Sequence, residues 1–269
     1  MNEYEQAAEK IAEEQGTGVV AGTITCPSGL AGRIRPLRGK DLADLTDEHL
    51  VETGQQIEEL LRRCWVETTD MGPYNGDSVD WSKVLLSDRY FVILKVRIAT
   101  FGPDFRFEFK CPGCRKVSAW KTDLTTLPVR PMAPADLEAF VAGNAITETM
   151  PDGRQFVFRL PIGADEPIGA RIVAAHNGQV NKAILPLVKT KIVEIAGVKS
   201  TRIGQYLDEG PVDLAFKIQR IMDKHYAGVD AKVHLDCQID TCRQEVRKTI
   251  PFVATMVGQL AGEDEMPRI

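Results

Sequence analysis

Four cysteines in two close pairs are the residues of this sequence best suited to do chemistry. Cys111 and Cys114 flank a Pro-Gly dipeptide, Cys237 and Cys242 enclose four residues, and 122 residues without a cysteine separate the pairs. Each pair lies at a turn between two strand-like segments, which is how a zinc knuckle is built. We predict that the four thiolates form one structural zinc site. Such a site is closed, because no coordination position remains for water or substrate.

Other uses of these cysteines stay open from the sequence. An iron-sulfur cluster is the alternative cofactor for the same four sulfurs. A disulfide-exchanging dithiol needs its first cysteine at a helix N-terminus, whereas Cys111 follows a strand pattern. His234 precedes Cys237 by three residues and could replace one ligand, but its place in an alternating strand favours a solvent-facing side chain. Cys26 and Cys64 are lone thiols in apolar surroundings, which is typical of buried free cysteines.

Short strands are expected to position both pairs. Residues 105–109 alternate phenylalanine with charged residues before the first pair, and residues 232–235 alternate valine and leucine with polar residues before the second. Alternation with period two predicts half-buried strands. Residues 117–120 and 245–250 are the expected return strands. Each pair should therefore lie at the tip of a β-hairpin.

Helices are expected between these strands. Apolar residues repeat with helical spacing over about 47–66, and a second segment, about 81–100, has a broad apolar surface that predicts packing on more than one neighbour. In the later half, we expect helices at 180–198 and 212–226. Pro186 should kink or split the first of these, because proline cannot donate the helical hydrogen bond.

Several signals recur at nearly equal spacing along the chain. Segments 25–41 and 149–165 both carry a Pro-x-Gly turn, a short strand pattern and a Gly-x-Asp sequence at a helix entrance. The distance from the turn glycine to the first cysteine of the following pair is 82 residues in the first half and 84 in the second. This regularity predicts an internal duplication.

The predicted fold class is therefore α+β, with two related units joined by a four-cysteine zinc ribbon. Each unit contains a β-hairpin, helices and a second hairpin that carries a knuckle. The expected divisions are a charged N-terminal helix in 1–20, a first unit in 21–127, a connector in 128–145, a second unit in 146–256 and an acidic tail in 257–269.

Composition and missing motifs narrow the classes of function. The net charge is -5, no basic arm is present, and no apolar stretch is long enough to span a membrane, so we expect neither nucleic-acid nor membrane binding. Phosphate-binding loops, dinucleotide fingerprints and zinc-protease motifs are absent from the sequence, so we expect no enzyme and no small-molecule substrate. Basic residues near the knuckles keep a nucleic-acid-binding ribbon as an alternative; they are Arg115, Lys116, Arg243, Arg247 and Lys248.

One region of the sequence resembles a known family. Residues 86–102, LSDRYFVILKVRIATFG, are followed by FEFKCPGC at 107–114 and by Thr-Asp-Leu at 122–124. This pattern is similar to the baseplate hub protein family of T-even-type contractile-tailed bacteriophages, in which a Gly-Asp-Arg helix leads to a Tyr-Gly turn and a Cys-Pro-x-Cys knuckle. Ser87 and Phe101 stand where the family usually has glycine and tyrosine.

The resemblance covers residues 23–126 well and the second half only in outline. It implies a structural or assembly role in the tail baseplate, through contacts with other hub or tail proteins. The expected location is the virion, or the host cytoplasm during assembly. A chaperone for the tail tape-measure protein is the alternative that shares the same sequence features.

Overall fold

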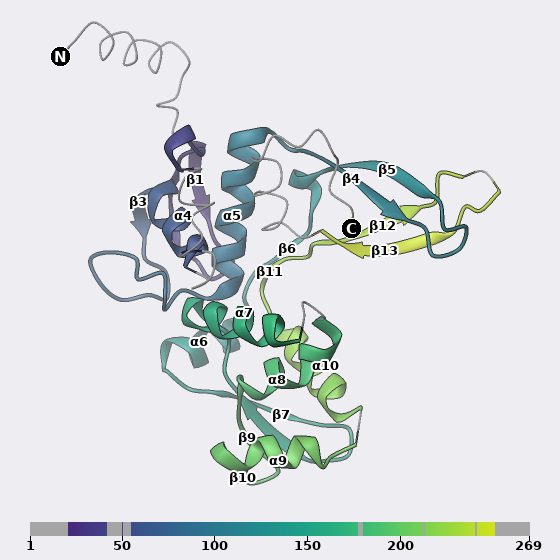
Figure 1. The fold of residues 1–269 in the computed structure, drawn as a ribbon. Helices are drawn as coiled ribbons and strands as arrows, with labels where there is room; N and C mark the ends of the chain where they lie inside the picture. The colour runs from purple at the N-terminus through teal and green to yellow at the C-terminus, as the bar shows by residue number, and fades with distance from the viewer. Residues whose placement is uncertain are drawn as a thin grey trace, which may run out of the picture.

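The computed structural model has a mixed α+β fold, in which every sheet is antiparallel (Figure 1). It describes residues 21–41, 50, 55–176, 180–211, 213–239 and 241–250. The expected N-terminal helix and acidic tail lie outside the described residues. Within the described part of the chain, no helix has both the length and the apolar character needed to cross a membrane. The predicted α+β class is confirmed.

The first sheet contains three strands in the order β1 (Ala21–Thr25), β2 (Ala31–Ile34) and β3 (Trp65–Asp70). Helix α4 (Gln56–Cys64) precedes β3 directly and buries one apolar face. The predicted helix over 47–66 is thus too long at its end, and its start lies mostly outside the described residues. Residues from Trp65 onward pair with β2 instead, since aromatic and β-branched side chains favour a pleated surface.

Helix α5 (Leu86–Phe101) lies between the other parts of the molecule (Figure 1). Phe91 and Val96 belong to the hydrophobic cluster of the first sheet and α4, and Leu94 belongs to a second cluster under the cysteine hairpins. Leu85, which precedes the helix, belongs to the third cluster, around the second sheet. The predicted packing on more than one neighbour is confirmed. Because its apolar residues lie on more than one face, the helix is buried on several sides.

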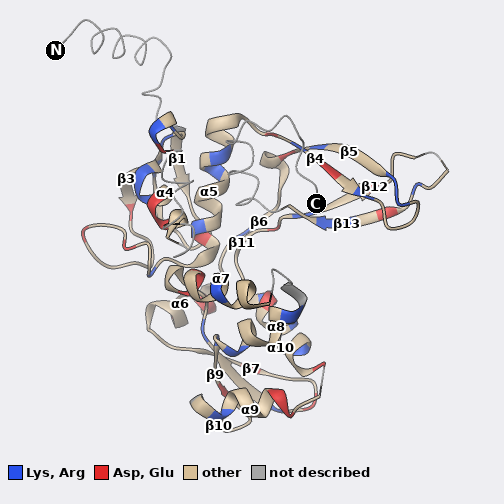
Figure 2. Ribbon diagram, in the orientation of Figure 1, with Lys and Arg blue, Asp and Glu red and all other residues tan. Residues whose placement is uncertain are grey.

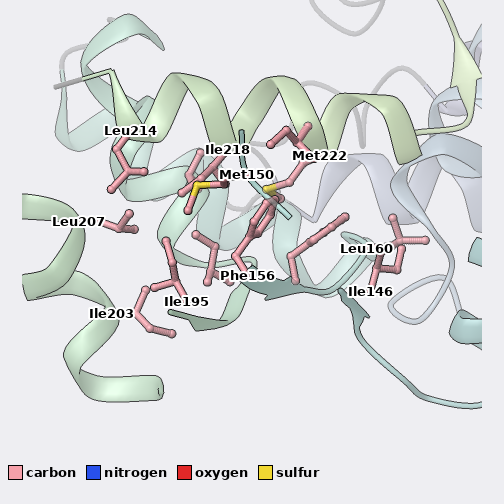
Figure 3. Close-up of a cluster of buried hydrophobic side chains, with 14 of the residues drawn as sticks. Ile146, Met150, Phe156, Leu160, Ile195, Ile203, Leu207, Leu214, Ile218 and Met222 are labelled. Carbon is pink, nitrogen blue, oxygen red and sulfur yellow. The ribbon is translucent and has the colours of Figure 1, made fainter. Parts of the chain in front are cut away.

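The second sheet has the strand order β10-β9-β8-β7. Its strands are β7 (Ile146–Thr149), β8 (Gln155–Phe158), β9 (Ile192–Ile195) and β10 (Val198–Lys199). The helices of this half are α7 (Glu166–Ala175), α8 (Val180–Lys189), α9 (Ile203–Asp208) and α10 (Leu214–His225). Figure 3 shows Leu214, Ile218 and Met222 of α10 in the buried cluster that also contains Phe156 of the sheet.

The predicted helix over 180–198 is wrong beyond Lys189. The remaining residues form β9 and β10, which are joined by a tight turn at Ala196 and Gly197, both with positive φ. Such a turn matches the twist of two antiparallel strands. Pro186 lies inside α8, and the helix is not split there. The predicted helix at 212–226 is confirmed as α10.

Short elements connect the two halves. Strand β6 (Val129–Arg130) pairs with β11 (Gly228–Val229), and helix α6 (Pro134–Val141) begins with proline in its first turn. The described residues also contain three short 3-10 helices: η1 (Leu124–Thr126), η2 (Gly163–Asp165) and η3 (Ser200–Arg202). The cysteine hairpins are β4 (Asp104–Lys110) with β5 (Val117–Asp123), and β12 (Lys232–Asp236) with β13 (Glu245–Thr249).

The same ion pair occurs after β2 and after β8. Arg35 donates two hydrogen bonds to Asp41, at 2.6 and 3.0 Å, and Arg159 donates two to Asp165, at 2.7 and 2.6 Å. The backbone amide three residues before each aspartate also donates to it. Burial acts to raise the pKa of both carboxyls, but these hydrogen bonds outweigh it and hold the pKa below the ordinary value.

A buried ion pair joins α5 to the second half. The Arg89 side chain is 1 % exposed, its guanidinium pairs with the Glu166 carboxylate at the start of α7, and it also donates to the backbone oxygen of Trp81 at 2.6 Å. Burial raises the pKa of Glu166 above its ordinary value, although Arg89 opposes the shift. Because the pair is buried, removing one partner would leave the other charge without compensation from water.

We expect Glu166→Gln to lower the free energy of unfolding by about 3 kcal/mol, because it leaves the buried Arg89 charge uncompensated. Urea unfolding followed by circular dichroism measures this. The matched control is Lys217→Met, which removes an exposed ion pair with Asp213 and should change the free energy by less than about 0.5 kcal/mol. Equal effects of the two substitutions would contradict a structural role for the buried pair.

Candidate metal centre

Both cysteine pairs lie at the tips of β-hairpins, as predicted. In the first tip, the backbone amide of Cys111 donates to the backbone oxygen of Lys116 at 2.9 Å. In the second tip, the backbone amide of Cys237 donates to the backbone oxygen of Gln244, also at 2.9 Å. The residue after the second cysteine has a positive φ in each tip, 60° at Arg115 and 44° at Arg243. Although the pairs differ in spacing, both turns therefore end in the same uncommon conformation.

The four sulfurs meet across the two hairpins. Cys111 Sγ lies 3.8 Å from Cys242 Sγ, and Cys114 Sγ lies 3.6 Å from Cys237 Sγ. All four atoms lie within 4.8 Å of one another. A tetrahedral ion with metal–sulfur bonds of about 2.3 Å separates its ligand sulfurs by about 3.8 Å. The four cysteines could thus hold one metal ion with little movement.

The local electrostatics differ between the two pairs. The backbone amide of Cys114 stabilises the Cys111 thiolate and, despite burial, lowers the pKa of Cys111 to about 7. At Cys237 the backbone amide of Ile239 acts in the same direction, but burial and the neighbouring sulfurs outweigh it and raise the pKa to about 11. A metal ion binds thiolates, so it would displace the remaining protons when it binds.

The two tips are in close contact around this site. Cys111 and Cys237 are buried, whereas Cys114 and Cys242 are partly exposed. A side chain on Gly113 would collide with Gln244 and crowd the sulfur of Cys242, which explains the glycine of the CPGC turn. Four sulfurs around one ion leave no position for a substrate, so the arrangement suits structural binding.

A hydrophobic cluster lies beneath the sulfurs and holds the same two hairpins together. Phe105, Phe107 and Phe109 of β4 are almost fully buried, and Val233 and Leu235 of β12 belong to the same cluster. These are the alternating residues from which both strands are predicted. The sulfurs therefore lie at the end of a packed core, which positions them independently of an ion.

The remaining candidate ligands do not join the site. His234 is exposed and lies 3.0 Å from Glu245 on the neighbouring strand, as its place in an alternating pattern predicts. Cys26 and Cys64 are buried free thiols in the cluster around α4. Burial raises the pKa of Cys64 to about 12, and it also raises the pKa of Cys26.

The arrangement of the four cysteines is the most distinctive feature of this chain. No family model, curated protein or solved structure matches this chain.

The structure also brings together polar residues that the sequence does not connect. The His225 ring nitrogens lie 2.9 Å from the Asp136 carboxylate and 3.0 Å from that of Glu148. Nearby, Lys191 Nζ donates to the Tyr226 hydroxyl at 3.1 Å. The partners come from elements far apart in the chain, so no local spacing in the sequence could reveal them.

We expect Phe107→Ala to lower the free energy of unfolding by about 3–5 kcal/mol, since it opens a cavity in the cluster shared by the two hairpins. It should also weaken metal binding, because the sulfurs would lose their fixed separation. Denaturant unfolding and chelator competition measure the two effects. Val117→Ala, at a 50 % exposed position of β5, is the control. Unchanged affinity for the metal would show that the core does not position the sulfurs.

Proposed function

We propose that the chain is a zinc-stabilised structural or assembly protein of a contractile phage tail baseplate, acting through contacts with other hub or tail proteins. The observation that carries the structural part is the four-sulfur cluster, because it joins hairpins far apart in the sequence and leaves no reactive position. A site of this kind stabilises an arrangement of chain segments. Its ion would contribute to folding and not to turnover.

Zinc is the ion that the site favours. Soft thiolates in tetrahedral positions suit zinc, and the sulfur separations of 3.6 and 3.8 Å fit a single ion. An iron-sulfur cluster distributes its four cysteines over two or more irons, which needs more widely spaced sulfurs. We therefore propose a four-cysteine zinc ribbon completed by two hairpins.

Several repeated features support two related units. In each half, a hairpin with a Pro-x-Gly turn pairs its second strand with a later strand that follows a helix, β3 after α4 and β9 after α8. The ion pairs Arg35–Asp41 and Arg159–Asp165 occupy the same place after that hairpin. Each half then continues through a helix to a cysteine hairpin. These correspondences favour an internal duplication.

The baseplate role rests on the likeness of residues 86–124 to the hub family. In the fold, this stretch is helix α5, the first cysteine hairpin and the start of η1, and its buried residues belong to the clusters of the first sheet and of the cysteine hairpins. Leu85, directly before the stretch, belongs to the cluster around the second sheet. A tape-measure chaperone would show the same features and remains the alternative within this class.

Exposed basic residues around the knuckles favour a second candidate, a zinc ribbon that binds nucleic acid. Arg115, Lys116 and Arg247 are exposed at or near the hairpin tips. However, Glu245 lies among them and interacts with Arg247 and His234, and both signs of charge occur along the hairpins (Figure 2). A mixed surface attracts phosphate weakly. Filter binding at low salt tests this candidate directly.

We expect purified protein to contain one zinc ion per chain and to lose it in Cys237→Ser, which removes one of four ligands. Elemental analysis measures the content, and cobalt substitution should give the spectrum of a tetrahedral tetrathiolate. Cys26→Ala, at a buried thiol outside the site, is the control and should keep the ion. Iron in place of zinc, or zinc retained in Cys237→Ser, would reject the proposed zinc site.

We expect the chain to occur in purified phage particles at a fixed number of copies, as a baseplate component does. Quantitative mass spectrometry of particles from infected cells, with lysate as reference, measures this. Presence in lysate and absence from particles would identify a transient assembly factor such as the chaperone. Absence of any association with tail proteins in both samples would reject the phage role altogether.

A further inference from the structure

An apolar cavity of about 300 Å³ lies between the two halves of the molecule, away from the cysteines. Its wall contains Leu85 and Tyr90 from the α5 region, Leu160 after β8, and Tyr226 after α10. A second hollow, of about 450 Å³, shares Tyr90 and Lys191 with it. The volume is at the lower end of the range for small-molecule sites, so the cavity suits a small ligand.

Lys191 places a positively charged side chain at the wall of this mainly apolar cavity. Its backbone is fixed, because its amide donates to the Val188 oxygen and its carbonyl accepts from the Arg159 amide. Its Nζ donates to the Tyr226 hydroxyl at 3.1 Å and lies 5.3 Å from the centre of that ring. No ion pair joins Lys191 to an acidic side chain among the described residues. Burial lowers the pKa of Lys191, as expected for an ammonium with little compensation.

The two carboxylates that act electrostatically on Lys191, those of Asp165 and Asp223, have hydrogen-bond partners of their own. Asp165 accepts two hydrogen bonds from Arg159, and Asp223 accepts one from Gln219 at 2.6 Å. Both act on Lys191 only through space. The ammonium group thus lies at an apolar cavity without a direct anionic partner, an arrangement that an incoming anion would stabilise.

The other titratable side chains of the wall are occupied. His225 has a carboxylate oxygen within 3.0 Å of each ring nitrogen, from Asp136 and Glu148. The Tyr90 hydroxyl interacts with Glu166. Among the charged groups that line the cavity, Lys191 is therefore the one positioned to receive an anionic ligand.

We propose that this cavity binds a small apolar molecule that ends in a carboxylate. The carboxylate would accept hydrogen bonds from Lys191 Nζ and the Tyr226 hydroxyl, and the apolar part would pack against Leu85, Met132 and Leu160. The half-buried ammonium group of Lys191 can bind a carboxylate through a short charge-assisted hydrogen bond, and the apolar wall rejects a fully hydrated ion. The proposal depends neither on the metal site nor on the phage role.

Octanoate, at concentrations below micelle formation, is the probe, and octan-1-ol is its uncharged counterpart of equal length. Isothermal titration calorimetry on the full chain should show octanoate binding about tenfold more tightly than octan-1-ol, because only the carboxylate pairs with Lys191. Lys191→Met should weaken octanoate binding about tenfold and leave octan-1-ol unaffected, whereas Lys191→Arg should keep most of the affinity. Lys199→Met, at an exposed lysine of β10, is the control and should bind as the unaltered protein does.

Circular dichroism establishes that each variant is folded, and the comparison of the two probes on the unaltered protein needs no variant. Octanoate should also raise the melting temperature of the unaltered protein but not that of Lys191→Met, since a ligand of the folded state stabilises it. Equal affinity for octanoate and octan-1-ol, or octanoate binding that Lys191→Met leaves unchanged, would overturn the proposal. So would the absence of octanoate binding at millimolar concentration.

Discussion

The burial of α5 on several sides is the constraint on which the rest of the structure depends. Its side chains, with Leu85 before it, reach three hydrophobic clusters that otherwise have few residues in common. The first sheet and the cysteine hairpins cover part of it, and its first turn meets the segment after β8, where the Leu86 amide donates to the Pro161 oxygen. Because the apolar residues of α5 would be exposed to water without these neighbours, the three parts must assemble around it together. The enclosed Arg89–Glu166 pair then fixes the start of the helix against α7.

The cysteine hairpins are held by a hydrophobic core and carry four sulfurs that could bind a metal ion. The phenylalanines of β4 and the aliphatic residues of β12 form a non-directional core, which tolerates small shifts. A metal ion bound by the sulfurs above it would require defined separations, because a tetrahedral ion accepts a narrow range of bond lengths. The core brings the tips together, and such an ion would select one arrangement among those that the core allows.

Sequence alone was sufficient for the elements whose pattern is local. The alternating phenylalanines predict β4, the cysteine spacing predicts two knuckles, and the broad apolar surface of α5 predicts several neighbours. The helix expected over 180–198 fails because β9 is short and apolar, and its pairing with β8 is a contact between distant residues. Lys191 and His225 gain their partners through the same kind of distant contact, which no spacing in the sequence records.

The four sulfurs are divided equally between the two hairpins. Each hairpin supplies two of them, and the contacts of 3.8 and 3.6 Å between sulfurs join one hairpin to the other. A polypeptide with only one such hairpin would supply two of the four ligands of a metal ion. A second copy of that polypeptide would have to supply the other two. Because both hairpins belong to one chain, the assembly of a four-sulfur site is a unimolecular event and does not depend on protein concentration.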